Sequence, residues 1–151
     1  MDYSQIKIVQ LEPMRVVYFH GFGESPEALA LEKLTCWAQA NGMRGRVFGF
    51  NNPGPGEGKS EYGYDVWMCV GEDEQMQNVE TLRFAGGLYA VLRCPVVHPW
   101  QDIPGGWQIL NSWLAQSGRT LGKHQWLEEH LDLPEPAAGV MFILDLYMPI
   151  E

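Results

Sequence analysis

The chain has 151 residues, of which 46% are hydrophobic and 19% are charged, and its formal net charge is −9. This length predicts one domain with its own hydrophobic core. The negative charge argues against direct binding to nucleic acid, whose phosphates require a basic surface, and it suits a cationic partner.

Several classes of protein are disfavoured by what the sequence lacks. The three cysteines have no metal-type spacing, which argues against a disulfide framework and favours a reducing, cytoplasmic location. No basic stretch followed by an apolar run marks a signal peptide. No segment approaches the roughly 20 apolar residues of a membrane helix. We therefore expect no membrane association.

The first half of the chain predicts a strand, a helix and two further strands. Ser25-Pro26 is typical of a helix N-terminus, and Asn41-Gly42 is typical of a helix C-terminus. Residues 52–60 (NPGPGEGKS) predict a loop because they are rich in glycine and proline. Residues rich in β-branched and aromatic side chains predict strands at 14–20, 46–51 and 62–70.

The second half predicts the same order of elements. A strand is expected over residues 88–94, followed by a long loop over residues 95–106. The helix is expected over residues 107–116, with Ser117-Gly118 ending it. Two strands, over residues 126–131 and 141–148, complete this half, with a loop between them.

The two helices predict an internal repeat. Leu34-x-x-Trp37 followed by Gly42 has the same spacing as Leu110-x-x-Trp113 followed by Gly118. We therefore predict an α+β fold of duplicated βαββ units, 1–72 and 73–151, with antiparallel sheets and pseudo-two-fold symmetry. Two copies packed side by side would leave a ligand cleft between the halves. The alternative is that two amphipathic helices share this spacing by coincidence.

An acidic segment, His124 to Leu131, offers the first candidate for function. If it is a strand, Trp126, Glu128 and His130 lie on one face. A carboxylate beside a core is costly to bury without a partner, and a lipophilic cation would be such a partner. We therefore choose Glu128 as the ligand-binding acid. The alternatives are that Glu129 is the inward residue, that both glutamates face water, or that the segment is a frayed helix end.

Aromatic residues offer the second candidate, because their ring faces bind cations and planar molecules. The alternative is that these rings belong to the core, which we favour for Trp37 and Trp113. The predicted ligand-binding set, besides Glu128 and His130, is Tyr18, Trp67, Tyr89, Trp107, Trp126 and Tyr147.

Metals and cofactors are not expected. His124 and Glu128 are four residues apart but do not form an HExxH motif, and packing by the Trp and Leu between them is the preferred interpretation. The glycine pairs do not match a nucleotide-binding loop, and no nucleophile motif is present.

Taken together, these segments resemble the effector-binding domain family of bacterial transcription regulators. That family includes gyrase-inhibitor-like small-molecule-binding proteins and integron-cassette cationic drug-binding proteins. The resemblance rests on YDVW at 64–67, GGLYAV at 86–91, LEEHL at 127–131 and LYMPI at 146–150. It also rests on the predicted helix that ends at Ser117-Gly118, with Trp107, Leu110, Trp113 and Leu114.

The resemblance implies a ligand cleft between two copies, with Glu128 matching the family's acidic pocket residue. It also implies cationic, lipophilic, often multi-ring ligands. The family usually has Tyr two residues after this acid, where this chain has His130. Such a change affects the response to pH or the preference for a ligand.

The main expectation is therefore a stand-alone protein that binds amphipathic, cationic, aromatic small molecules, linked to transcription regulation through a partner chain or to drug sequestration. A first alternative is a hydrolase of electrophilic, cyclopropane-type compounds with Glu128 as general base, although a non-enzymatic role is preferred. A second alternative is an inhibitory module that binds another protein.

Overall fold

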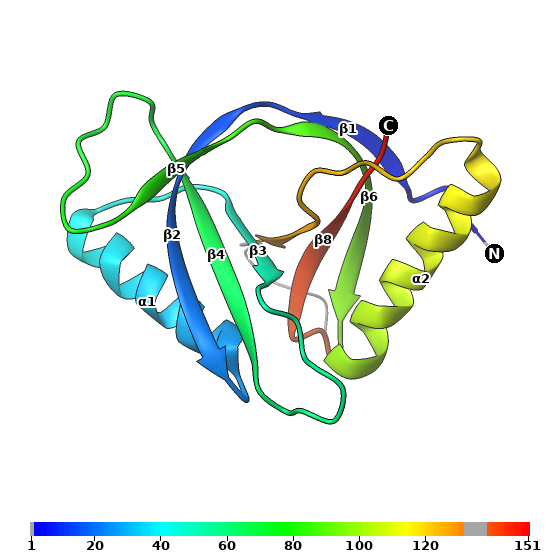
Figure 1. Ribbon diagram of the computed structural model, residues 1–151, viewed down its shortest axis with the longest axis horizontal. Helices are drawn as coiled ribbons and strands as arrows, with labels where there is room; N and C mark the ends of the chain where they lie inside the picture. Colours follow the sequence, from blue (N-terminus) through cyan, green and yellow to red (C-terminus); the bar gives the residue numbers. More distant parts are fainter. Residues whose placement is uncertain (1, 132–138) are drawn as a thin grey trace. The chain divides into compact units, whose positions relative to one another are not determined.

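A computed structural model describes residues 2–131 and 139–151 (Figure 1). Within these residues the chain forms eight strands and two helices. They group into two compact units. The N-terminal unit is Pro13–Ala85, and the C-terminal unit combines Met1–Glu12 with Gly86–Glu151. The predicted α+β class with antiparallel strands and two main helices is confirmed.

In the N-terminal unit, helix α1 packs on a four-stranded antiparallel sheet. Its elements are β2 (Met14–Gly23), α1 (Pro26–Asn41), β3 (Val47–Asn51), β4 (Tyr62–Val70) and β5 (Thr81–Phe84). The strand order is β3-β4-β2-β5. The predicted third strand of this half, residues 62–70, has the bounds of β4.

The C-terminal unit repeats this arrangement around helix α2. Its elements are β6 (Gly87–Val96), α2 (Pro99–Ser117), β7 (Leu127–Leu131), β8 (Phe142–Pro149) and β1 (Lys7–Leu11). The strand order is β1-β6-β8-β7, so β6, β8 and β7 correspond to β2, β4 and β3.

The outermost strand of each unit comes from the other half of the sequence. Strand β1 precedes β2 along the chain but pairs with β6. Strand β5 precedes β6 but pairs with β2. The predicted repeat, 1–72 and 73–151, describes the order of elements along the chain, and the compact units differ from it by this exchange of outer strands.

The two helices end as their glycines predict. Gly42 and Gly118 both adopt the left-handed conformation at the helix C-terminus, with φ of 63° and 78°. This conformation is accessible to glycine because it lacks a Cβ atom. Leu34 and Leu110 are buried against their sheets, and both repeated tryptophans pack at the edges of these cores.

The predicted loop over residues 95–106 is wrong, because α2 begins at Pro99. Pro99 is compatible with a first helical position, where its missing N–H has no partner in any case. The Asp102 carboxylate accepts hydrogen bonds from the backbone N–H groups of Val97 and His98 at 2.8 Å each. Pro104 and two glycines follow, and packing on the sheet overrides their low helix propensity.

The structure differs from the sequence-based expectation in three smaller ways, which concern an additional strand, the end of a strand and a helix cap. Strand β5 was not predicted, and β2 continues through Gly23 rather than ending at His20. Ser25 occupies the predicted N-cap of α1, but its side chain makes no capping hydrogen bond. The predicted loop after β7 falls mostly on residues 132–138, which lie outside the described residues.

Neither helix in the described part of the chain is long and apolar enough to cross a membrane. Cys36, Cys69 and Cys94 are not joined by disulfide bonds.

Candidate functional site

The C-terminal unit has one face packed against α2 and an opposite face without a helix (Figure 1). Alternate residues of β6 and β8, such as Leu92 and Leu146, are buried in the core beneath α2. The residues between them therefore lie on the other side of the sheet, which we call the helix-free face.

Three charged side chains stand in one row across this face. Arg93 on β6 is directly opposite Asp145 on β8, and Asp145 is directly opposite Glu129 on β7. We call Arg93, Asp145 and Glu129 the charged row. The Arg93 Nε and Nη2 atoms donate to the two carboxylate oxygens of Asp145 at 3.0 and 3.2 Å. This hydrogen bond is the main cause of a raised pKa at Arg93.

Glu129 is a buried carboxylate held by a tyrosine. Only 7% of the residue is exposed, and Tyr147 Oη donates to Glu129 Oε1 at 2.8 Å. Burial of a carboxylate in a protein is tolerated when hydrogen bonds or charges compensate for lost water. Tyr147 lies two residues after Asp145 on the same face of β8, so it borders the charged row.

Aromatic rings continue this face beside Tyr147. The Tyr89 ring makes edge contacts with Tyr147 and His124, with centroids 5.4 and 4.8 Å apart. Tyr89 Oη donates to the backbone oxygen of Gln125 at 2.6 Å. Burial raises the pKa of Tyr89, so its hydroxyl stays neutral. The face therefore combines a buried carboxylate with fixed aromatic edges.

Glu128 lies on the opposite side of β7, toward α2. Glu128 and His130 pair across the strands with Leu146 and Leu144, which both belong to the α2 core. The predicted alternation along this strand is confirmed. Glu128 is half-buried. Burial raises the pKa of the Cys94 thiol to about 11, and the negative charges of Asp102 and Glu128 make smaller contributions in the same direction.

The other predicted residues on the α2 side are two tryptophans and His130. Trp107 on α2 and Trp126 pack edge to face at 5.3 Å and border the core. Burial lowers the pKa of His130 to about 4, although the nearby negative charge of Glu129 raises that pKa by a smaller amount. His130 is therefore neutral at neutral pH.

In the N-terminal unit, Trp67 and Tyr18 are neighbours across β4 and β2. Trp67 is 6% exposed and packs between Phe50 and Phe84, at centroid distances of 4.9 and 5.1 Å. Tyr18 Oη donates to the Glu80 carboxylate, and this hydrogen bond is the main cause of a raised pKa at Tyr18.

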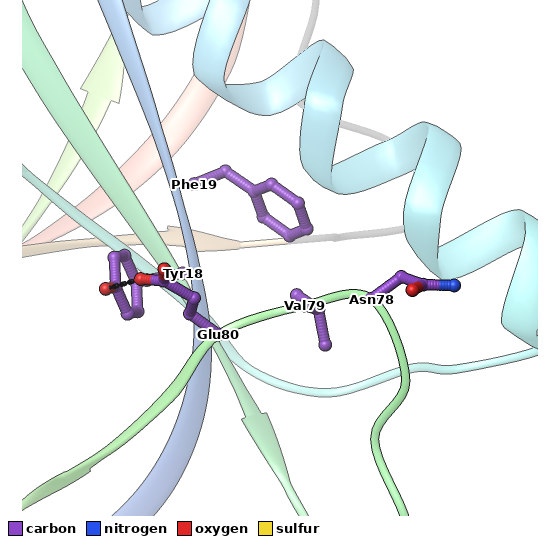
Figure 2. A pocket seen from close by; sticks show the side chains of 5 residues that line it. All are labelled: Tyr18, Phe19, Asn78, Val79 and Glu80. Carbon is purple, nitrogen blue, oxygen red and sulfur yellow. Dashed lines mark hydrogen bonds between the residues drawn. The ribbon is translucent and has the colours of Figure 1, made fainter.

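An open surface hollow lies where the segment that leads into β5, residues 78–80, runs beside β2 (Figure 2). Tyr18 and Glu80 are on one side of β2, whereas Phe19 and Val79 are on the other. The hollow therefore wraps around a sheet edge and does not gather these side chains around one point. Its full lining is Tyr18, Phe19, Asn78, Val79 and Glu80.

The predicted ligand-binding residues thus divide among three places. Tyr89 and Tyr147 meet on the helix-free face of the C-terminal unit. Trp107, Trp126, Glu128 and His130 lie on its α2 side, and Tyr18 and Trp67 lie in the N-terminal unit. The role of this set, and the cleft between the halves, stay predictions.

Arg93 and Asp145 are not among the predicted site residues, and Glu129 enters only as the alternative to Glu128. One signal was available in the sequence. Asp145 and Tyr147 are two apart on a predicted strand, so they had to share a face. Which glutamate joins them depends on which face of β7 is covered by a helix, and strand alternation alone does not decide this.

The described residues contain no group of three or more His, Cys, Asp or Glu side chains that could hold a metal ion. The helix-free face offers hydrogen-bonding groups, charged side chains and aromatic contacts.

Several solved structures share this fold. No curated protein matches the chain. Among solved structures, the C-terminal domain of EcmrR superposes with a TM-score of 0.71 at 12% identity, covering 97% of both chains. SAV2435 bound to tetraphenylphosphonium superposes with a TM-score of 0.58 at 12% identity, covering 100% of this chain and 94% of that one.

A hydrolase from Listeria innocua superposes with a TM-score of 0.66 at 11% identity, covering 97% of this chain and 92% of that one. At these identities the likeness shows a shared fold. The model of the GyrI-like small molecule binding domain matches residues 4–151. The chain therefore belongs to the GyrI-like small-molecule-binding family.

Proposed function

We propose that the protein binds amphipathic, cationic, aromatic small molecules, with the helix-free face of the C-terminal unit as the charge-recognising surface. The observation that carries the proposal is the buried Glu129 carboxylate, fixed by Tyr147 beside the Tyr89 ring. A carboxylate in such surroundings attracts a lipophilic cation more strongly than one in water, because less solvent screens the charge.

The two tyrosines beside Glu129 support its carboxylate. Tyr147 and Tyr89 are both buried, and the hydrogen bonds of their hydroxyl groups hold the rings in place. A carboxylate that is fixed before binding loses little side-chain entropy when the ligand arrives.

The charged row contains two carboxylates, Glu129 and Asp145, beside the single guanidinium of Arg93. The net charge of −9 for the whole chain favours a cationic ligand. The relative SAV2435, bound to tetraphenylphosphonium, supports this ligand class for the present chain.

Two adjacent glutamates allow a matched test. Tetraphenylphosphonium and the neutral triphenylphosphine oxide are titrated calorimetrically against wild type, Glu129→Gln and Glu128→Gln. We expect Glu129→Gln to weaken the phosphonium at least tenfold and to leave the neutral ligand within about twofold, since loss of a weakly screened ion pair costs ~1.4 kcal/mol or more. Glu128→Gln, on the α2 side, should leave both affinities close to wild type.

The opposite pattern would reassign the acid. A larger loss with Glu128→Gln would return the role to the residue that the family resemblance implies. Unchanged affinities in both variants would remove the charge argument altogether.

A hydrolase function is the second candidate, supported by the hydrolase from Listeria innocua among the structural relatives. Here the Glu129 carboxylate would act as general base for water, with the Tyr147 hydroxyl beside it at 2.8 Å. Product formation from an electrophilic cyclopropane-bearing substrate, abolished in Glu129→Gln, would favour this candidate over binding alone.

A link to transcription would require a DNA-binding element other than the two helices of this structure. Helix α1 packs on the strands of the N-terminal unit and α2 on those of the C-terminal unit. The two helices therefore do not form a helix-turn-helix pair that could enter a DNA groove. The negative net charge acts against contact with phosphates. Ligand-dependent co-purification with a DNA-binding protein would support this role.

A further inference from the structure

We infer that His20, held by Asp65, acts as a general base that hydrolyses small aryl esters, an activity beyond the proposed binding function. His20 on β2 is directly opposite Asp65 on β4 in the N-terminal unit. Val17 and Phe19 pack on the α1 side of this sheet. His20 and Asp65 therefore lie on the other side, which faces away from α1.

Hydrogen bonds fix the orientation of the His20 imidazole. Its Nδ1 atom lies 2.5 Å from Asp65 Oδ1. An ionised carboxylate only accepts hydrogen bonds, so Nδ1 carries the proton and donates the hydrogen bond. Asn52 Nδ2 donates to the second carboxylate oxygen, Asp65 Oδ2, at 3.0 Å. In this tautomer Nε2 keeps a lone pair and is the proton acceptor of the ring.

The imidazole is accessible to solvent, whereas its carboxylate partner is largely covered. The side chain of His20 is 46% exposed and that of Asp65 is 14% exposed. In the described part of the chain, Nδ1 is the only ring atom of His20 that makes a hydrogen bond. A Cβ atom built at Gly63 would lie 2.8 Å from His20 Cε1, so the ring rests close to backbone that has no side chain. The ring is therefore held in one place, with Nε2 available to a reactant.

The C-terminal unit has a basic residue paired with an aspartate at the corresponding positions. Arg93 on β6 is directly opposite Asp145 on β8. Arg93 precedes Pro99, the first residue of α2, by six residues, and His20 precedes Pro26, the first residue of α1, by the same interval. An arginine side chain keeps its proton in proteins, so it does not act as a base. Of these two paired residues, His20 alone is able to accept a proton.

Phe22 and a water molecule supply the other parts of the reaction. Phe22 is two residues after His20 on the same side of β2, is 53% exposed and is directly opposite Gly63. Its ring offers an apolar surface for an aryl group. His20 Nε2 takes a proton from water as the water oxygen bonds to the carbonyl carbon of the ester. The bond to the aryloxide then breaks, and the proton passes from Nε2 to that leaving group, which yields a carboxylic acid and a phenol.

The repeat supplies a matched variant for the test. Hydrolysis of p-nitrophenyl acetate is followed by the absorbance of released p-nitrophenolate in wild type, His20→Gln, His20→Arg and His98→Gln. His20→Arg copies the Arg93–Asp145 pair, so Asp65 keeps a charged partner while the base is lost. Both His20 variants should lower kcat at least about tenfold, because a positioned base contributes roughly 10²–10⁴-fold. His98→Gln, at an exposed histidine of the C-terminal unit, should hydrolyse the ester at the wild-type rate.

Two more variants separate the roles of the neighbouring residues. Asp65 orients the base and does not contact the ester, so Asp65→Asn should lower kcat and leave KM nearly unchanged. Phe22→Ala should raise KM, with a smaller effect on kcat, because it removes apolar surface that contacts the aryl group. The wild-type rate should be lower in D₂O than in H₂O, because a proton moves in the rate-limiting step.

Four results would overturn the inference. The first is hydrolysis by wild type that does not exceed that of folded His20→Arg. The second is an equal loss in His98→Gln, which would indicate a general reactivity of exposed histidines. The third is an equal rate in D₂O and H₂O, which would indicate direct attack by the imidazole. The fourth is loss of activity in Glu129→Gln with activity retained in His20→Arg, which would assign the hydrolysis to the C-terminal unit. If Asp65→Asn does not fold, the comparison of wild type with His20→Arg decides alone.

Discussion

Gly106 allows α2 to lie close to its sheet, and a single added methyl group tests this packing. A Cβ atom built at Gly106 lies 2.5 Å from Leu146 Cδ1, whereas carbon atoms in contact are normally about 3.5–4.0 Å apart. Leu146 is 0% exposed, so its side chain has no solvent into which it can move. Gly105, one residue earlier in the same helix, has no atom within 4 Å of its Cβ position.

The two glycines therefore predict opposite effects. Gly105→Ala should raise the free energy of unfolding by about 1 kcal/mol, because alanine has higher helix propensity. Gly106→Ala gains the same backbone contribution but overpacks the core, which costs about 1–3 kcal/mol. The difference between the variants should be about 1–3 kcal/mol, or several degrees in Tm for a chain of this size.

Chemical denaturation monitored by tryptophan fluorescence measures both free energies. Leu146→Val removes the clashing Cδ1 atom, so the pair Gly106→Ala/Leu146→Val should be less destabilised than the sum of the single variants by at least about 1 kcal/mol. If Gly106→Ala stabilises the protein as much as Gly105→Ala does, the close approach of helix and sheet is refuted.

Three further predictions concern titration and hydrogen bonds. Because the pKa of His130 is lowered to about 4, the unfolded chain binds a proton that the native chain does not between pH 6.5 and 4, so stability should fall as pH is lowered through this range, by up to about 3 kcal/mol. His130→Gln should flatten that slope in denaturation series, whereas exposed His98→Gln should not. Tyr89→Phe leaves the Gln125 carbonyl without its donor and should cost about 1–2 kcal/mol by the same assay; no loss would show that water replaces the hydroxyl. Arg15 Nη1 donates to the backbone oxygens of Gly71 and Glu74 at 3.1 and 2.7 Å, so Arg15→Lys should increase amide hydrogen exchange in residues 71–74, with β4 as the unaffected reference.

Sequence patterns predicted the elements well where local rules suffice. The high content of β-branched and aromatic residues is enough to predict β4, since such side chains favour strands. Gly42 and Gly118 mark helix ends because the left-handed conformation strongly favours glycine. The repeated order of elements, together with the family resemblance, led to the α+β class that the structure confirms.

Tertiary packing decided what these local rules could not. Residues 99–106 are helical although they contain Pro104 and two glycines, because the sheet beneath α2 offers a surface for that turn and Gly106 permits close contact. The short strand β5 owes its existence to pairing with β2 and lacks a strong pattern of its own.

The candidate site shows the same division. Alternation along β7 established that Glu128 and Glu129 point to opposite faces, and only the position of α2 shows which of them lies under the helix. The charged row depends on strand register, because Arg93, Asp145 and Glu129 are far apart in the chain and adjacent only through the pairing of β6, β8 and β7. A sequence states which side chains share a strand face; long-range pairing determines which of them meet.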